Sequence, residues 1–450
     1  MDDNSWQSVT DSLIKQAMHA GATDAEVLLR TSTRTEVVTR MGETDGVLQA
    51  RETVAGLRVF SGTRSVVVSG SDISEPALAA LVDAAMSRVR FAPEDPFAGL
   101  PDVDESGTST PDLDLYDPQL ESLDIEQALS LSYEAERAAF GVDPRISNSE
   151  GSECVYGCVD EVFSNSRNVY RHCRSSRIDL HVVPLAIANG VMERDSWFSS
   201  KRYLSDLADP ATIGELAAHR ALRRLSAVQA LTCKVPVIFE ARAAASLLGD
   251  LATAVSGYQI YKKSSYLCGK IGEVIGSALL NVEDNPLVPR GPGSRPFDGD
   301  GLLTRRLPIV ENGRLLTYLT DTYSGRRLGV ESTRNANRNP ADAPMVGVSN
   351  LRLRSTDVPV GDLISEVKNG VMVTELFGFG VNTTTGSYSR GAAGIWIENG
   401  RLTYPVHEFT IASTLPLIFA GIVGIADDAH PDMRFSSPSL LISEMTIAGK

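Results

Sequence analysis

His407 and Glu408 have the residue types of a zinc site, because histidine binds zinc and an adjacent glutamate can polarise a metal-bound water. Such a site needs a second histidine on the same helical face, and Ala412 stands where that ligand would have to be. Pro405 and the β-branched Val406 favour a strand over a helix. Adjacent residues of a strand point to opposite faces, so this pair is not expected to share a metal.

A glycine-rich segment from Val371 to Ser413 surrounds the pair and contains the run GSYSRGAAG at residues 386–394. Glycine lets a backbone approach a ligand closely, and it also marks strands that bulge or turn sharply. We therefore expect substrate binding here, by the backbone or by side chains. The candidate binding residues are Gly378, Gly380, Ser389, Arg390, Gly391 and Gly394.

Other catalytic motifs are weak or missing in this segment. No G-x-S-x-G nucleophile elbow is present, so a catalytic Ser389 beside Arg390 is the less favoured alternative to a bulged strand. Gly378-Phe379-Gly380 begins like a dinucleotide fingerprint, but Thr383 replaces its third glycine and there is no Walker lysine. Phosphate binding is disfavoured.

Histidines and cysteines elsewhere show no clear ligand spacing. The histidines are His19, His172, His181, His219 and His430. Cys154 and Cys158 are four residues apart on a predicted strand, so both are expected on one side of it. With five cysteines and no C-x-x-C pair, reduced thiols are favoured over zinc or a disulfide. The charged run 192–195 is interpreted as a salt-bridged turn at a strand end, with a partner or peptide contact as the alternative.

Composition narrows the class of protein. The chain has 450 residues, 42% of them hydrophobic and 22% charged, which is typical of a globular protein with more than one domain. The net charge of -15 argues against nucleic acid or an anionic membrane as a partner. The first residues have neither a basic flank nor an apolar run, and no stretch reaches the roughly 20 apolar residues of a spanning helix. A cytoplasmic protein is expected.

Hydrophobic periodicity predicts an α+β fold. Residues 1–90 are expected to form an amino-terminal α/β domain, with a helix ending at Gly21, strands at 25–31, 34–42, 46–62 and 63–71, and a helix at 75–89. Residues 91–124 are rich in proline and acids and are predicted to be an extended linker without a core of its own, which could wrap the surface.

Residues 125–230 are expected to continue the amino-terminal part. A helix is predicted at 125–140, strands at 145–151, 154–165, 169–190 and 192–203, and a helix at 211–225. Residues 231–450 are predicted to form a mainly antiparallel β domain, entered by a strand at 234–240 and a buried helix at 241–255. Asn312-Gly313 and Asn399-Gly400 are hairpin signals.

Seven sequence motifs resemble the TldD/PmbA family of bacterial metalloproteases over essentially the whole chain. They are ISNSEG (146–151), VMERD (191–195), KVPVIFE (234–240), RPFDGDG (295–301), TDTYSGRRLG (320–329), VMVTELFGFGV (371–381) and GSYSRGAAGIWIENG (386–400). The resemblance is to the PmbA-type subunit. It implies an amino-terminal α/β domain joined to a mainly β domain, and a heterodimer with a TldD-type subunit.

The resemblance also implies where a metal would be bound. The TldD-type partner carries zinc on a buried helix as His-Glu-x-x-x-His, with a cysteine ligand far downstream. In this chain the corresponding helix, 241–255, has no histidine, and no cysteine follows Cys268. Because a catalytic zinc needs three protein ligands, we expect no catalytic residue, no metal ligand and no cofactor in this chain, with zinc in the partner.

The function implied by this resemblance is that of a non-catalytic subunit in a cytoplasmic zinc protease for unfolded or modified small peptides. The glycine-rich strands around 378–394 are expected to offer backbone edges to which an extended peptide substrate adds as a strand. A stand-alone peptide-binding or chaperone-like protein is the alternative, and a self-sufficient hydrolase using Ser389 and Arg390 ranks last. The substrate, the cleavage preference, the interface and self-association are not given by the sequence.

Overall fold

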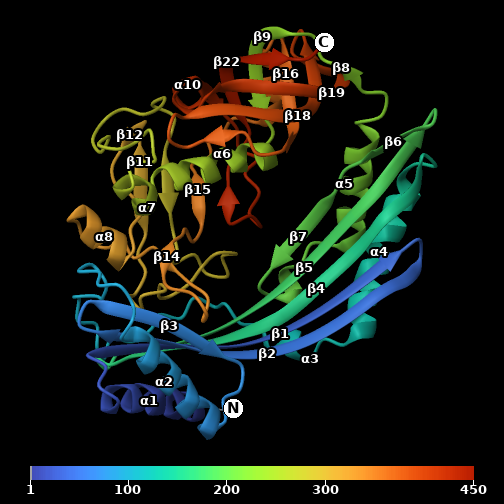
Figure 1. Cartoon of the computed structure of the whole chain (residues 1–450). Helices are drawn as coiled ribbons and strands as arrows, with labels where there is room; N and C mark the ends of the chain where they lie inside the picture. Colours follow the sequence, from blue (N-terminus) through green and yellow to red (C-terminus); the bar gives the residue numbers. More distant parts are fainter. Residues whose placement is uncertain (1–2) are drawn as a thin grey trace.

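Four strands of 17 to 20 residues form the centre of a curved antiparallel sheet along one side of the molecule (Figure 1). The computed structural model describes residues 3–450. The sheet order is β3-β2-β1-β4-β5-β6, with β7 paired to β5. The strands are β1 Asp24–Arg40, β2 Glu43–Ser61, β3 Arg64–Gly70, β4 Ile146–Asn165, β5 Tyr170–Ala188, β6 Val191–Arg194 and β7 Trp197–Lys201. Stretches on both sides of residues 91–124 therefore share one sheet.

Two of these strands correct the sequence prediction, which divides each of them in two. β1 pairs with β2 without a break through Ser32 and Thr33, and β4 runs through a bulge next to Gly151. The polar residues that suggest a turn in β1 are strand residues on or near a face open to solvent. A half-exposed strand and a turn have similar compositions, so the sequence alone does not separate them.

Two pairs of helices cover the same face of the sheet. The helices are α1 Asp3–His19, α2 Glu75–Val89, α4 Ile125–Val142 and α5 Pro210–Leu222. Val27 and Val37 of β1 differ by an even number of positions, so they share a face; Val27 packs in the α1–α2 core and Val37 in the α4–α5 core. The other face turns towards the carboxyl-terminal half, which Leu28 and Phe163 contact through Phe297.

Residues 91–122 contain no strand and follow the surface between the two halves of the molecule. Leu100, Leu113 and Leu115 are buried, and the short helix α3 Pro118–Ser122 packs on β4. The guanidinium of Arg326 donates to the carbonyl oxygens of Phe97 and Leu100. This proline- and acid-rich segment thus packs onto cores that belong to its neighbours.

Five strands of the carboxyl-terminal half close into a barrel. They are β9 Cys233–Phe239, β16 Asn369–Phe377, β18 Ser387–Glu398, β19 Arg401–Thr414 and β22 Leu440–Ala448. β9 pairs with β16 and β22, β18 with β16 and β19, and β19 with β22, so the ring is complete. The helix α6 Ala241–Ala254 shares the main hydrophobic core with this barrel. The predicted α+β class with a mainly antiparallel β carboxyl-terminal half is confirmed.

Shorter elements complete the fold around the barrel and the long sheet. They are η1 Leu204–Asp206, β8 Val228–Gln229, α7 Gly257–Tyr261, β10 Val282–Asp284, β11 Leu307–Glu311, β12 Arg314–Leu315, α8 Thr322–Leu328, β13 Ala336–Asn337, β14 Met345–Val346, β15 Leu351–Leu353, α9 Val360–Glu366, β17 Val381–Asn382, α10 Leu415–Ala420, β20 Ile422–Ile425 and β21 Phe435–Ser436. Both predicted Asn-Gly hairpins are confirmed, with positive φ at both turn residues.

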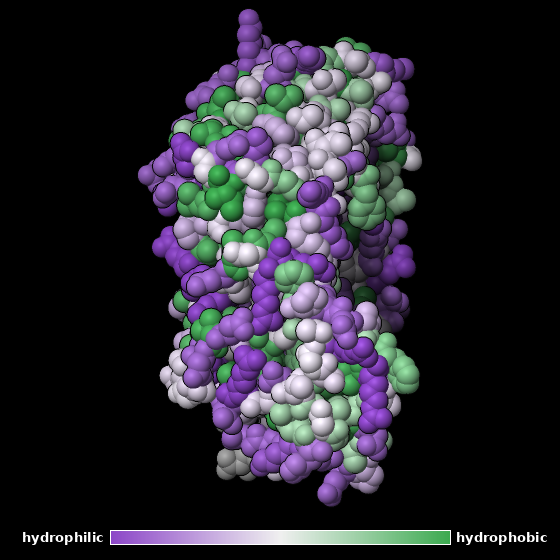
Figure 2. All heavy atoms as spheres, turned by 60° about the vertical axis from the view of Figure 1, so that its left-hand side comes forward, coloured by the Kyte–Doolittle hydropathy of each residue, from purple (hydrophilic) through white to green (hydrophobic). Residues whose placement is uncertain are grey.

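The surface mixes polar and apolar residues. On the face shown in Figure 2, hydrophilic residues surround smaller groups of apolar ones. Within residues 3–450, no helix has the length and apolar character needed to cross a membrane.

Candidate functional site

The buried helix α6 is where the family resemblance places the ligands of a catalytic metal. Its apolar residues pack in the barrel core, and its polar residues are Arg242, Ser246, Asp250 and Thr253. Asp250 is thus its only residue of a metal-ligating type. In the described part of the chain, no three histidine, cysteine, aspartate or glutamate side chains are grouped to hold a metal. A zinc ion does not fit the donors that α6 provides.

His407 and Glu408 lie in β19, as the sequence predicts. The expectation that they face opposite sides needs correction, because a bulge in the β18–β19 pairing opposite them interrupts the regular alternation. Glu408 has a φ of 51°, and its carboxylate accepts a hydrogen bond of 2.8 Å from Gln229 Nε2. This pair therefore has a local structural role where β8 meets β19.

The six predicted binding residues all come together in one hairpin made by β16, β17 and β18. Gly378 and Gly380 lie in the bulge between β16 and β17, and Gly378 has a φ of 69°. Ser389 and Arg390 lie opposite this bulge, since the Ser389 amide donates a 2.7 Å hydrogen bond to the Gly380 carbonyl oxygen. The remaining two glycines follow along β18.

The prediction that Gly391 and Gly394 lie at a free strand edge is wrong. Gly391 pairs with Phe377 on one side and with Thr410 on the other, and Gly394 likewise lies between β16 and β19. A side chain on Gly394 would place its Cβ 2.1 Å from the carbonyl oxygen of Met372. Closure of the barrel, which the local sequence does not show, occupies both sides of β18.

A free strand edge lies nearby, on β16 and β17. β9 pairs with β16 only through Val371–Val373, whereas β16 continues to Phe377 and β17 follows it. Among the strands of residues 3–450, β18 is the only lateral partner of this continuation. On this edge the Phe377 side chain is 43% exposed and the Phe379 side chain is fully exposed. The edge that an extended peptide could extend is therefore residues 374–382.

Four polar side chains from this hairpin, α6 and the loop after α7 lie near enough to influence one another's pKa. They are Asp250 of α6, Tyr266 from the loop after α7, and Tyr388 and Arg390 of β18, which we call the α6–β18 cluster. Tyr388 is 1% exposed, whereas the next residue, Ser389, is exposed on the outer side. Within residues 3–450, Asp250 Oδ2 and the Tyr266 hydroxyl are buried and make no hydrogen bond.

Burial raises the pKa of the acidic groups in the cluster, and the positive charge of Arg390 opposes part of this shift for Asp250 and Tyr388. Burial raises the pKa of Asp250 to about 6, and the positive charge of Arg390 partly opposes that shift. Burial also raises the pKa of Tyr266, with a further contribution from the charge of Asp250. For Tyr388, burial raises the pKa and Arg390 opposes the shift. The cluster can thus offer hydroxyl and guanidinium donors and one carboxylate acceptor to a polar ligand.

The ion pairs predicted for residues 192–195 are present and form a larger network than the sequence suggests, but residues 192–194 lie in the strand β6 and not in a turn. Asp195 lies 3.3 Å from Arg220 of α5 and 3.7 Å from Arg242 of α6. Arg224 pairs with Glu193 at 3.4 Å. These ion pairs join β6 and α5 to the start of α6, which fixes the position of the helix relative to the long sheet.

The motif at residues 295–301 also has a structural role. Asp298 is buried and accepts backbone hydrogen bonds from Asp300, Leu302 and Ala336 at 3.0, 3.0 and 3.1 Å. Burial and the charge of Asp300 raise the pKa of Asp298. Because this one carboxyl group accepts hydrogen bonds from three backbone amides, it fixes the conformation of the loop.

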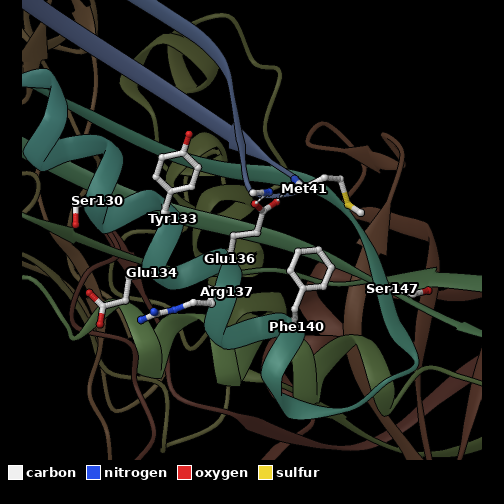
Figure 3. Close-up of a pocket in the computed structure, with 9 residues that line it drawn as sticks. Met41, Ser130, Tyr133, Glu134, Glu136, Arg137, Phe140 and Ser147 are labelled. Atoms are coloured by element: carbon white, nitrogen blue, oxygen red, sulfur yellow. Dashed lines mark hydrogen bonds between the residues drawn. The ribbon is translucent and has the colours of Figure 1, made fainter.

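A separate cavity of about 650 Å³ lies between α4 and the β1–β2 turn (Figure 3). Tyr133, Phe140 and Met41 contribute to its walls. Glu136 holds the turn, because its two carboxylate oxygens accept 3.0 Å hydrogen bonds from the amides of Met41 and Gly42. No binding residue predicted from the sequence lines this cavity.

Sequence reasoning missed three members of the α6–β18 cluster, Asp250, Tyr266 and Tyr388. A signal was present for Asp250, since it is the one acid in a helix otherwise rich in alanine and leucine. Tyr388 lies two residues before Arg390 on β18, so strand alternation could have indicated it, whereas no local pattern identifies Tyr266.

Three family models match consecutive parts of the chain. They are described as PmbA/TldA metallopeptidase domain 1, central domain and C-terminal domain, and they match residues 25–88, 118–225 and 232–449. The metalloprotease PmbA of Escherichia coli is 37% identical over 426 residues, covering 95% of this chain and 92% of that protein. A Haemophilus influenzae homologue of PmbA is 33% identical over 437 residues, covering 97% and 94%.

Solved structures agree with this assignment. A Bacteroides thetaiotaomicron protein, provisionally described as a modulator of DNA gyrase, superposes with a TM-score of 0.91 at 26% identity over 100% of both chains. The chain belongs to the PmbA/TldD metallopeptidase family, a family of hydrolases. Within it the chain is a PmbA-type member, as the identity to two PmbA proteins over most of its length shows.

Proposed function

We propose that this chain is the non-catalytic subunit of a heterodimeric zinc metalloprotease, in which a TldD-type partner supplies the zinc. The observation that carries the proposal is the side-chain chemistry of α6, whose only ligand-type residue is Asp250. One carboxylate cannot replace the three protein ligands of a catalytic zinc. In a member of a metallopeptidase family, this lack of ligands supports a metal supplied by another chain.

The contribution of this chain is to hold and admit substrate. We propose unfolded or modified small peptides as substrates, because the free edge at residues 374–382 can pair with an extended main chain. The exposed Phe377 and Phe379 provide apolar contacts beside that edge. The net charge of -15 agrees with a cytoplasmic complex that has neither nucleic acid nor membrane as a partner.

Purification of the tagged chain from its native source tests this proposal. We expect a stoichiometric second chain, one zinc per heterodimer by elemental analysis, and cleavage of an unstructured peptide that a chelator abolishes. The purified chain alone should contain no zinc and should not cleave.

Two results would overturn the proposal. Peptide binding without any co-purifying zinc protein would identify a stand-alone binding or chaperone-like protein. Chelator-resistant cleavage by the chain alone, lost in Ser389→Ala, would identify a self-sufficient hydrolase.

A further inference from the structure

A cavity of about 340 Å³ lies over the five-stranded sheet β12-β11-β10-β15-β21 and shares no lining residue with the α6–β18 cluster. The strand registers place a row of its lining residues side by side. Pro308 of β11 pairs with Glu283 of β10, which pairs in turn with Arg352 of β15. Arg352 also pairs with Ser436 of β21. This row across four strands forms the floor of the cavity.

The half-buried guanidinium of Arg352 has no partner in this floor. Within residues 3–450 it makes neither a hydrogen bond nor an ion pair. Glu283 lies directly opposite, at a cross-strand position where the two Cβ atoms are about 5 Å apart. The Glu283 carboxylate nevertheless accepts from Arg306, with Nε–Oε2 at 2.9 Å. The acid nearest to Arg352 in the sheet is therefore already used by another arginine.

Burial of one end of the Arg352 guanidinium fixes which of its donors remain. Nε is buried and unbonded, whereas the two Nη atoms are accessible and so are the donors open to the cavity. Other half-buried arginines of this region are hydrogen-bonded: Arg295 Nε donates to Ser349 Oγ at 2.8 Å, and Arg202 Nη2 donates to the Pro292 carbonyl oxygen at 2.9 Å. A half-buried cation without an acceptor is costly, which indicates that Arg352 serves a ligand.

The charges around the cavity favour a ligand with a single negative charge. Three arginines and two glutamates line it, a surplus of one positive charge: Arg306, Arg352, Arg354, Glu283 and Glu311. Because Arg306 neutralises Glu283, the uncompensated positive charge lies at Arg352 and Arg354, which are two positions apart and share a face. A guanidinium suits the planar carboxylate group well, whereas a phosphate dianion would bring more negative charge than this surplus compensates.

The remaining lining of the cavity is largely apolar. Val310, Leu353, Pro308, Ala429 and Pro431 contribute to it. A volume of about 340 Å³ is at the lower end of the range for ligand pockets, about 300–1,000 Å³, so it suits one or two residues of a chain. A carboxylate next to an apolar group matches both the free guanidinium and these walls.

We propose that this cavity binds a carboxylate of a peptide, with the Nη atoms of Arg352 donating to the carboxylate oxygens. The exposed Arg354 adds positive charge at the rim. The carboxylate belongs to the C-terminus or to an acidic side chain, since both present the same group. The choice of a peptide rests on the proposed function, whereas the carboxylate site rests on Arg352 and the charges of the cavity. Binding here would hold one point of a substrate on this chain.

Isothermal titration calorimetry with the full-length chain and three acetylated pentapeptides tests the proposal. The first peptide, Gly-Ser-Gly-Ala-Leu, has a free C-terminal carboxylate, and the second is the same peptide with an amidated C-terminus. The third is amidated and has glutamate in place of alanine. The first or the third should bind at least about tenfold more tightly than the second, the size expected for a hydrogen bond to a charged group. Which of them binds identifies the source of the carboxylate.

Variants of the floor test the role of Arg352. Arg352→Met should weaken binding of the carboxylate peptide by about tenfold or more, and Arg352→Lys, which keeps the charge but not the planar fork, by less. Glu283→Gln removes the nearest negative charge and should tighten binding by about threefold, a gain that misfolding would not produce. Arg401→Met, which changes an exposed arginine of β19, is the matched control and should bind like the wild type.

Four results would overturn the proposal. They are no binding of either carboxylate peptide by the wild type, equal affinity for all three peptides, unchanged affinity in folded Arg352→Met, and displacement of the peptide by inorganic phosphate at lower concentration than by acetate. The last would identify a phosphate site. If Arg352→Met does not fold, Glu283→Gln keeps the test valid, and wild-type or weaker affinity in that variant would count against the site.

This outcome is separate from that of the proposed function. If the zinc heterodimer forms and cleaves while Arg352→Met binds the carboxylate peptide normally, the inference about Arg352 fails and the subunit assignment stands. If carboxylate binding depends on Arg352 but no zinc partner exists, the site stands and the subunit assignment fails.

Discussion

Arg220 of α5 and Glu240, the residue before α6, form a two-pronged ion pair in which Nη1–Oε1 is 3.1 Å and Nη2–Oε2 is 2.9 Å. The two side chains are 9% and 12% exposed. Arg220 belongs to the part of the chain matched by the central family domain, and Glu240 to the part matched by the C-terminal domain. A buried, hydrogen-bonded pair thus links these two parts at the point where α6 begins.

Removing Arg220 should destabilise this junction. Arg220→Met leaves Asp195 and Glu240 partly uncompensated, and breaking a buried ion pair costs about 3 kcal/mol or more. Urea unfolding followed by far-UV circular dichroism measures the loss in free energy of unfolding. Arg34→Met removes an exposed pair with Glu36 and should cost less than about 1 kcal/mol. Equal costs in the two variants would contradict a structural role for the buried pair.

The ionised carboxylate of Asp250 should lower the free energy of unfolding above pH 6. Burial raises its pKa from 3.8 to about 6, so the fold disfavours the ionised form, and this cost grows between those two pH values. Below pH 3.8 the carboxyl group is protonated in both the folded and unfolded chain, so the cost disappears. Asp250→Asn should therefore raise the free energy of unfolding at pH 7.5 by about 1 kcal/mol, a figure reduced for partial exposure.

Asp250→Asn should not raise the free energy of unfolding near pH 3.8, where the carboxyl group is largely protonated. Urea unfolding at several pH values would show this. Arg390, Tyr266 and Tyr388 are the charged and titratable groups that face Asp250, and Arg390 limits the shift. Asp83→Asn on the exposed face of α2 is the control and should show no such pH dependence. A gain that is the same at every pH would show that the carboxyl pKa is not its cause.

The Asp298 side chain should contribute strongly to the stability of the loop at residues 295–301. Asp298→Ala removes the acceptor for three buried backbone amides, and leaving them without partners should cost about 3 kcal/mol or more. Asp298→Asn keeps one acceptor oxygen and should cost less. Chemical denaturation measures both, with the exposed Asp45→Ala as a near-neutral control. If Asp298→Ala unfolded with the same free energy as the wild type, water would have to be the hydrogen-bond acceptor of these amides.

Local patterns in the sequence predict the elements better than their assembly. The helix at 75–89 and both Asn-Gly hairpins are predicted because capping, periodicity and turn chemistry are local. β1 is divided wrongly because Ser32 and Thr33 lie at polar strand positions. Barrel closure depends on pairing between β9 and β22, about 200 residues apart, which no local pattern encodes. For the same reason Arg390 is predicted as a candidate, but its neighbours Asp250 and Tyr266 are not.

The two glycines of β18 should respond very differently to substitution. A Cβ on Gly394 would lie 2.1 Å from the Met372 carbonyl oxygen, a backbone atom that cannot move without breaking the β16–β18 pairing. A Cβ on Gly391 would lie 3.4 Å from Phe377 Cβ, an ordinary contact. Gly394→Ala should therefore cost about 2 kcal/mol or more, the range of overpacking and strain, whereas Gly391→Ala should cost less than about 1 kcal/mol. Thermal unfolding of the two single variants, which share chemistry, strand and barrel, isolates the effect of this one close approach. Equal stability of the two would mean that β18 can shift within the barrel, and the packing role assigned to Gly394 would be wrong.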